Sequence, residues 1–302
     1  IRDSSTSRGL GDVYKRQQFV LPANSQYRPT LAKLSEKPEI QIDPKTGALT
    51  SYIYEGQEYL ASPVRLSLYR PATDNDNREK KGGAKVWRKL GLNHLVQRVL
   101  SVKTSGHTTY SEVKLLNDKN DTIGSATFEY TIRKDGILSV QTRFVPDTTF
   151  VSSLARVGLV FEMPHSFNRV TYLGRGEHET YADRKLSGRI GIYHTDAERM
   201  FHYYVRPQAT GNRTDVRWMQ VSDELEKGLS VWGEKPFEFS VSPFTDENID
   251  AAGHINELKR NGTVTVHLDA LQSGVGTATC GPGVLAPCLL YTSPSPRDVE
   301  ES

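Results

Sequence analysis

Hydrophobic and polar residues alternate along much of this chain, and a period of two predicts β-strands rather than helices. In Thr127–Ile132 every second residue is apolar, and Arg133–Gly136 follows as a turn marked by its Asp-Gly pair. Ile137–Val145 alternates again and predicts the returning strand of a hairpin. The same alternation predicts further strands at Tyr110–Leu115, Arg156–Phe161, Gly228–Trp232, Phe237–Val241 and Thr263–Leu268.

Turn signals separate these strands, and helical periodicity is scarce. Asp43–Gly47 predicts a turn between strands at Ile40–Ile42 and Leu49–Tyr54, while Ala84–Leu92 and Asp246–Leu258 predict short helices. Many short strands with regular turns indicate a sandwich or barrel, and an all-β unit of this length commonly forms one domain. The sequence therefore predicts an all-β fold.

Composition narrows the class of protein. The chain has 38 Lys and Arg against 36 Asp and Glu, so it offers no basic surplus for nucleic acid. Mean hydropathy is −0.52, and no apolar run approaches the ~20 residues of a membrane helix. Cys280 and Cys288 are too few for a disulfide framework or a zinc site. We expect a soluble chain with no metal site of its own and no nucleic-acid or membrane partner.

The two ends differ in character from the middle. Residues 1–17 contain a stretch that resembles a translated sequencing-library adapter, and residues 288–302 contain one that resembles its reverse complement. Natural disordered tails are the alternative. Because neither end shows a strand or helix period, we expect both to be foreign to the natural protein. Residues 18–37 then read as a linker from a preceding domain, and residues 38–287 as a truncated β-sandwich domain.

Two polar clusters are candidates for chemistry. Thr73–Asp76 has spaced carboxylates that suit Ca²⁺, but the Gly and Glu of a calcium loop are not in place, which favours a polar turn. In Gly174–Lys185, Glu177 and Glu179 would share one face of a strand and His178 the other. A metal cluster or an acid–base pair is therefore less favoured there than a glycine-rich turn held by Arg–carboxylate pairs.

Two later segments are less specific. Arg206–Trp218 combines Asn, Arg and Trp, which suits sugar binding and a loop-to-strand corner equally well. Gly274–Gly283 is rich in glycine but lacks the Lys and the following helix of a phosphate loop. Cys280 is a lone cysteine within it, and a lone cysteine is more often inert than nucleophilic.

In this order the motifs resemble those of family 2 β-galactosidases. Tyr69–Asp76 resembles the family's aromatic-Arg to Thr-Asp-Asn-Asp element, and Tyr172–Lys185 resembles its Leu-Gly-Arg-Gly to Asp-Arg stretch. Arg206–Trp218 resembles its Arg-Pro-Gln to Asn-Arg-Thr-Asp-Val-Arg-Trp segment, and Gly274–Gly283 its closing loop. The resemblance covers about residues 40–287 and identifies the C-terminal, small-chain domain.

The resemblance implies a large antiparallel supersandwich, similar to galactose mutarotases, and a retaining hydrolase of terminal β-D-galactosides such as lactose. Retention needs two carboxyl groups about 5–5.5 Å apart. In the family both are Glu on an upstream (β/α)₈ barrel that this chain lacks, so no catalytic residue is expected here and the fragment alone is predicted to be inactive.

The full-length family implies Mg²⁺ and Na⁺ (or Ca²⁺) bound by other domains, a barrel partner in the same chain and a homo-oligomer. It also implies a cytoplasmic or periplasmic location, which the sequence itself leaves open.

Two loops of the domain are implied to reach the substrate. The first follows Thr-Asp-Asn-Asp and places Asn77, Arg78 and Glu79 beside the substrate, and the second places Thr279 and Cys280 near the aglycone. Some family members carry Trp at the Cys280 position, and Cys cannot stack on a sugar as Trp does. Charged and amide residues of the motifs are expected to be structural: Arg70, Asp74, Asn75, Asp76, Arg175, Glu179, Asp183 and Arg184.

Two alternatives stay open. A free-standing mutarotase-like enzyme would need a Glu base and a His acid, for which Glu177 or Glu179 with His178 or His202 is the best set. A carbohydrate-binding module would need an aromatic platform, which the tryptophans offer: Trp87, Trp218 and Trp232.

Overall fold

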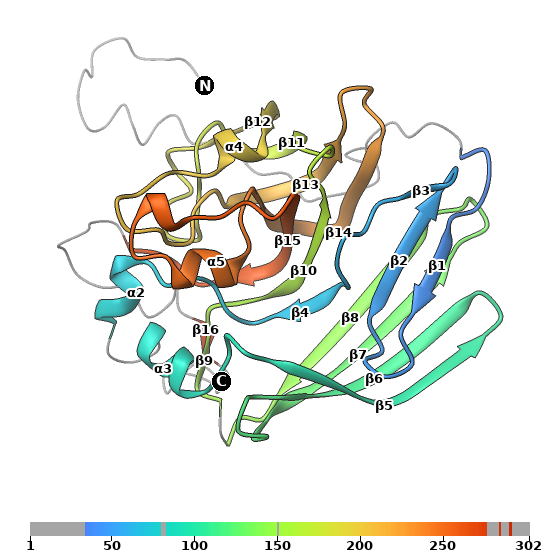
Figure 1. Ribbon diagram of the computed structural model, residues 1–302, viewed down its shortest axis with the longest axis horizontal. Coiled ribbons are helices and arrows are strands. Elements are labelled where there is room, and N and C mark those ends of the chain that lie inside the picture. Colours follow the sequence, from blue (N-terminus) through green and yellow to red (C-terminus); the bar gives the residue numbers. More distant parts are fainter. Residues whose placement is uncertain (1–33, 80–82, 150, 277–283, 285–289, 292–302) are drawn as a thin grey trace, which may run out of the picture.

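The computed structural model describes residues 34–79, 83–149, 151–276, 284 and 290–291 (Figure 1). Antiparallel strands are its main regular elements, and the helices are short. The predicted all-β fold of packed antiparallel sheets is therefore confirmed. No helix in these ranges is both long and apolar enough to cross a membrane.

The largest sheet has seven strands in the order β12-β11-β13-β14-β15-β10-β4, and each neighbouring pair is antiparallel. Its strands are β4 (Arg65–Ser67), β10 (Arg156–Pro164), β11 (Arg169–Gly176), β12 (Arg189–Asp196), β13 (Arg213–Ser222), β14 (Gly228–Ser242) and β15 (Thr263–Gln272). The early strand β4 pairs with β10 at one edge, so a segment from the first quarter of the chain joins strands from its second half.

Two smaller sheets come from the first half of the chain. One is a four-stranded meander of β5 (Val96–Ser105), β6 (Thr108–Leu116), β7 (Thr122–Ile132) and β8 (Leu138–Pro146). The other contains β1 (Glu39–Ile42), β2 (Leu49–Tyr54) and β3 (Gln57–Glu58). A short pair joins β9 (Ser153–Leu154) to β16 (Leu290–Tyr291). β16 falls within residues 288–302, which the sequence predicts to be adapter-derived, and the domain boundaries stay predictions.

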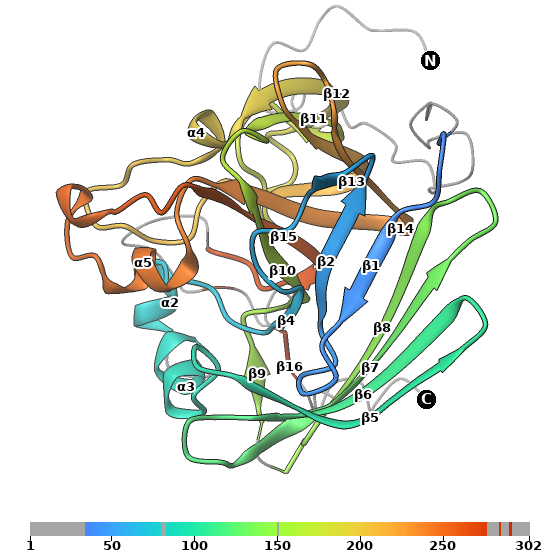
Figure 2. The ribbon, with the colours of Figure 1, turned by 45° about the vertical axis from the view of Figure 1, so that its right-hand side comes forward.

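The helices are α2 (Asp74–Arg78), α3 (Ala84–Lys89), α4 (Ala197–Met200), α5 (Asp246–Ala251) and the 3₁₀ turn η2 (Ile255–Glu257). In both views the three- and four-stranded sheets lie on one side of β4, β10 and β15, and α2, α3 and α5 lie on the other (Figures 1 and 2).

The core lies between the sheets. Buried side chains from the seven-stranded sheet pack in one cluster with those of the smaller sheets, including Met219, Phe239, Phe128 and Leu49. Along β14, Phe239 and Val241 face this core, and the intervening residues point to the opposite side, as the period of a strand requires. We call that opposite side the outer face of the seven-stranded sheet.

Several predicted elements need correction. The hairpin of β7 and β8 and the turn before β2 are confirmed, but 228–232 and 237–241 belong to one strand, β14. Its middle, which contains Pro236, hides the continuity in the sequence. The helix predicted over 84–92 ends at Lys89, and the one predicted over 246–258 ends at Ala251, because Ala252 is extended (φ −78°, ψ 123°).

Candidate functional site

The four motif segments meet around Arg70, a guanidinium with no exposed surface. Its Nε and Nη2 donate to the two carboxylate oxygens of Asp76 at 3.1 and 2.8 Å. Nη1 also donates to Gln272 Oε1 at 3.1 Å and to the Ser273 carbonyl at 2.5 Å, and Nη2 donates to the Gly274 carbonyl at 2.7 Å. A buried charge is tolerated only when it is paired and hydrogen-bonded in this way. Arg70 thus joins its own motif to residues 272–276, which lead into the closing loop and are called the closing segment below.

The Thr-Asp-Asn-Asp run is the start of a helix. Thr73 Oγ1 accepts from the Asp76 amide at 3.1 Å, and Asp76 Oδ2 accepts from the Thr73 amide at 2.9 Å, which is a capping box. The predicted bonds from side chains to nearby amides are present, but they begin α2 instead of closing a turn. The Asp74 amide donates to Gln208 Oε1 at 3.1 Å, so the third motif also contacts this helix.

The closing segment is held from two sides. Asp183 Oδ1 and Oδ2 accept from the amides of Val275 and Gly276 at 3.2 and 2.7 Å, and Asn75 Nδ2 donates to the Val275 carbonyl at 2.7 Å. Gly276 has φ +77°, and a Cβ there would lie 2.7 Å from Asn75 Nδ2. Glycine is therefore the residue that fits both this backbone and this contact. The predicted aglycone residues Thr279 and Cys280 lie outside the described residues.

Glu179 fastens the second motif to the third. Its carboxylate accepts from Arg184 Nη2 at 2.9 Å, Thr210 Oγ1 at 2.8 Å, the Gly211 amide at 3.0 Å and the Tyr204 hydroxyl at 3.2 Å. Burial acts to raise the pKa of Glu179, but the bonds from Gly211 and Thr210 and the charge of Arg184 outweigh it and lower that pKa. Through these four bonds the Glu179 carboxylate links its own segment to the segment 204–211.

A second ion-pair group lies beside it. Arg175 Nε donates to Asp215 Oδ2 at 2.5 Å, and Lys185 Nζ donates to Asp215 Oδ1 at 3.2 Å. Burial would raise the pKa of Asp215, but the Arg175 hydrogen bond and the Lys185 charge lower it. Arg175 also donates to the Gly188 carbonyl at 2.9 Å. The predicted turn held by Arg–carboxylate pairs is what the structure contains, with Asp215 as a partner that the sequence did not suggest.

The residues predicted to lie beside the substrate sit at the end of α2. Asn77 and Arg78 are exposed, and Glu79 is half-buried. Asn77 Nδ2 donates to the Thr73 carbonyl at 3.1 Å, and Arg88 Nη1 donates to Asn77 Oδ1 at 3.0 Å. This stretch of α2 starts the first loop, next to the backbone from which the second loop starts.

The sequence did not single out two carboxyl groups that the structure buries. Glu238 and Asp269 are partners across β14 and β15 on the outer face. Burial raises the pKa of Glu238 to about 7, although Asn212 Nδ2 donates to it at 2.7 Å. Burial also raises the pKa of Asp269, which lies 3.8 Å from the Arg156 Nη1 and accepts from Gln272 Nε2 at 3.3 Å. In the sequence each is only an acid in an alternating strand, and nothing there shows that the face is covered.

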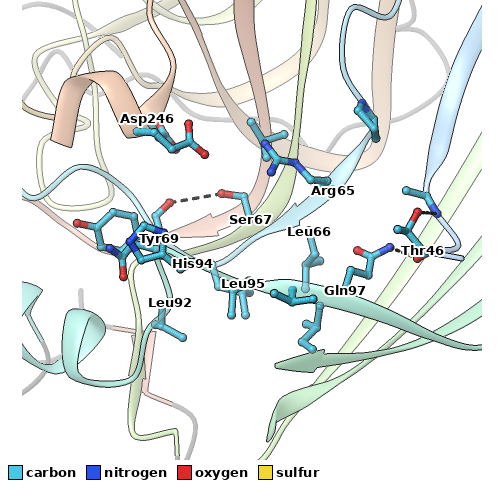
Figure 3. Close-up of a pocket in the computed structure, with 18 of the residues that line it drawn as sticks. Thr46, Arg65, Leu66, Ser67, Tyr69, Leu92, His94, Leu95, Gln97 and Asp246 are labelled. Carbon is cyan, nitrogen blue, oxygen red and sulfur yellow. Dashed lines mark hydrogen bonds between the residues drawn. The ribbon is translucent and has the colours of Figure 1, made fainter. Parts of the chain in front are cut away.

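A cleft of about 740 Å³ opens between β4, α5 and the start of β5 (Figure 3). Asp246, Arg65 and Ser67 lie at one end of it, whereas the other end is lined by leucines: Leu66, Leu92 and Leu95. Of its described lining residues, Tyr69 belongs to the motif segments, and its hydroxyl donates to Asp250 at 2.9 Å. None of the described residues of the two loops lines this cleft.

The residues of the mutarotase-like alternative have other contacts. His178 Nε2 lies 2.9 Å from Ser187 Oγ, and the His202 ring lies 4.3 Å from that of Tyr204. Within the described ranges no group of three or more His, Cys, Asp or Glu side chains is placed to hold a metal ion. Trp87 is buried in the core, so the three tryptophans do not form one platform.

These packed antiparallel sheets, with polar segments that hold two loops, define an all-β sandwich domain. The family model described as beta galactosidase small chain matches residues 35–298, and the chain belongs to this family.

Three similar proteins are the β-galactosidases of Priestia megaterium, Actinobacillus pleuropneumoniae and Kluyveromyces lactis, at 29%, 27% and 29% identity. The matches cover 86%, 81% and 81% of this chain but 26%, 24% and 24% of those relatives. The chain spans about a quarter of the length of the curated relatives it matches.

Proposed function

We propose that this chain is the small-chain domain of a retaining β-galactosidase that hydrolyses terminal β-D-galactosides such as lactose, and that it completes the aglycone side of the active site. The main support for this proposal is the Arg70 joint, by which we mean the hydrogen bonds of the buried Arg70 guanidinium to Asp76, Gln272, Ser273 and Gly274. There Asp183 and Asn75 hold the backbone of Val275 and Gly276 against α2. The loop after α2 and the closing loop therefore begin next to each other, from backbone that these hydrogen bonds hold in place. Two loops that contribute to one site need such a fixed starting point.

The proposal assigns no catalytic carboxyl to this chain. Retention needs a nucleophile and an acid/base that both touch the glycosidic bond. Three of the motif acids already have protein partners: Asp76 pairs with Arg70, Glu179 with Arg184, and Asp183 with two backbone amides. The catalytic pair is assigned to an upstream barrel of the full-length chain, so the chain alone is expected to be inactive. A homo-oligomer, with Mg²⁺ and Na⁺ or Ca²⁺ on other domains, belongs to the same proposal.

Recovery of the complete reading frame tests this directly. The proposal expects a sequence upstream, in the same frame, that encodes alternating strands and helices with two candidate catalytic Glu residues. It also expects the complete protein to hydrolyse a nitrophenyl β-galactoside. A reading frame without such a segment, or a complete protein that leaves β-galactosides intact, would show the proposal to be wrong.

A further inference from the structure

Two tryptophans lie side by side on the outer face of the seven-stranded sheet. Trp218 on β13 is the register partner of Trp232 on β14, and Leu173 on β11 is the partner of Trp218 on its other side. Ile192 on β12 pairs with Leu173 and continues the row. The first three are half-buried and Ile192 is 59% exposed, so this apolar row reaches solvent.

Neither indole N–H in this row has a hydrogen-bond partner among the described residues. Trp87 is the internal contrast, because it is fully buried and its Nε1 donates to Ser153 Oγ at 3.2 Å. A tryptophan that is partly removed from water usually finds an acceptor for its N–H. Trp218 and Trp232 thus combine partly exposed aromatic side chains with two indole donors that have no protein partner in the described part of the chain.

A second row runs beside the first and is polar but uncharged. It lies two residues along each strand, about 7 Å away, and joins Gln220 to Ser230 on one side and to Thr171 on the other. Thr171 Oγ1 and His194 Nδ1 are 3.0 Å apart and satisfy each other. The Gln220 amide and the Ser230 hydroxyl have no side-chain hydrogen bond within the described part of the chain. No Asp, Glu, Lys or Arg belongs to either row.

We propose that Trp218, Trp232, Gln220 and Ser230 form a binding site for a single neutral pyranose. The carbon–hydrogen face of a sugar ring stacks on indoles, while its hydroxyls need donors and acceptors placed at the edge of the aromatic surface. The two rows supply both at the spacing of one sugar ring. Both rows are uncharged, and the charged residues that flank them, Arg169 and Arg175, are paired with acids of the chain. The two rows therefore suit an uncharged, polyhydroxylated ligand better than a phosphate, a nucleic acid or a cation. We expect a single sugar on this partly exposed surface to bind weakly, with a Kd on the order of 1 mM.

This site is independent of the proposed hydrolase function, because binding is measured on the present chain and needs no catalytic domain. The chain has three tryptophans, so ¹⁵N-tryptophan labelling gives three indole signals, one for each site. Titration with methyl β-D-galactoside should shift the Trp218 and Trp232 signals along one saturable curve. The signal of the buried Trp87 should stay in place and report that the chain is folded.

Variants distinguish sugar binding at these four residues from non-specific effects of the sugar on the chain. Trp232→Phe keeps an aromatic side chain but removes the indole N–H and part of the ring surface, and Gln220→Ala removes the neighbouring amide. Each should weaken binding at least about fivefold. Leu225→Ala, in the turn between β13 and β14 where Leu225 is 79% exposed, is the matched control and should bind as the unmodified chain does.

The proposal is overturned if the two indole signals show no saturable shift, or if all three signals drift together. It is equally overturned if Trp232→Phe and Gln220→Ala both bind with unchanged affinity. Shifts caused only by the rest of the enzyme, and not by the sugar, would identify the surface as a protein interface instead.

Discussion

Arg70 and Asp76 form a two-point ion pair that is closed to solvent, with Nε–Oδ2 and Nη2–Oδ1 distances of 3.1 and 2.8 Å and side-chain exposures of 0% and 2%. The same Asp76 carboxylate caps α2, and the same guanidinium holds Gln272, Ser273 and Gly274. One pair therefore fixes the start of both loops that the proposed function requires.

Replacing Asp76 with Ala should strongly destabilise the chain. The change leaves the Arg70 guanidinium buried without its counter-charge, which costs about 3–5 kcal/mol. Urea unfolding measures the difference. The matched control is Asp135→Ala, whose partner Arg133 is 45% exposed, because an exposed pair contributes about 0–1 kcal/mol. Equal losses of unfolding free energy in the two variants would contradict the view that the buried Arg70–Asp76 pair stabilises the chain more than an exposed pair does.

A methyl group at Gly276 should distort the closing segment. Gly276→Ala forces a side chain into positive φ, at about 1–2 kcal/mol, and also into contact with Asn75. Gly106→Ala is the control, since Gly106 has φ +60° but no atom within 4 Å of the added Cβ. Unfolding free energies should show a larger loss at Gly276, and an equal loss would mean that the Asn75 contact is unimportant.

Asp183 should control the local opening of the closing segment. Asp183→Ala removes the acceptor from the amides of Val275 and Gly276. Because charge-assisted bonds contribute about 1.5–3 kcal/mol each, these two amides should exchange with solvent deuterium at least about tenfold faster. Strand amides of β7 serve as the reference and should be unaffected. Unchanged exchange at Val275 and Gly276 would remove Asp183 from this role.

Glu238 should make stability depend on pH. Burial raises its pKa from 4.5 to about 7, so its contribution is complete below pH 4.5 and is lost as the pH rises to about 7. Glu238→Gln keeps the acceptor for Asn212 but has no proton to lose. Relative to the unmodified chain, it should therefore gain about 3 kcal/mol between about pH 4.5 and pH 8.

Urea unfolding of both chains across that range gives the difference directly. The nearby charged groups Asp269, Lys185 and Asp215 are present in both chains, so their own titration largely cancels. A constant difference across the range would mean that Glu238 ionises normally in the folded chain.

Local sequence signals predicted the elements whose structure is local. The Asp-Gly turn of the β7–β8 hairpin is one, because a turn and two alternating strands are enough to specify it. The Arg70 joint is different. Gln272 lies 202 residues from Arg70, and no period or spacing brings them together. The burial of Glu238 likewise depends on which segments cover the outer face, a tertiary property that a single strand does not encode.

The candidate site likewise contains contacts that the sequence predicted and contacts that it did not. The sequence predicted that Arg175, Glu179 and Arg184 enter Arg–carboxylate pairs, since residues of opposite charge crowd one short stretch. It did not predict that Asp183 would leave these pairs and accept from the closing segment. The choice among nearby acids is made by three-dimensional placement.

The central claim is that this domain completes a galactosidase site without supplying its catalytic carboxyl groups. The most direct test compares nitrophenyl β-galactoside hydrolysis by the complete enzyme, by this chain alone and by the enzyme truncated before residue 35. We predict turnover by the complete enzyme, none above the buffer rate by the chain alone, and a large loss on truncation. Turnover by the isolated chain, or full activity in the truncated enzyme, would contradict the claim.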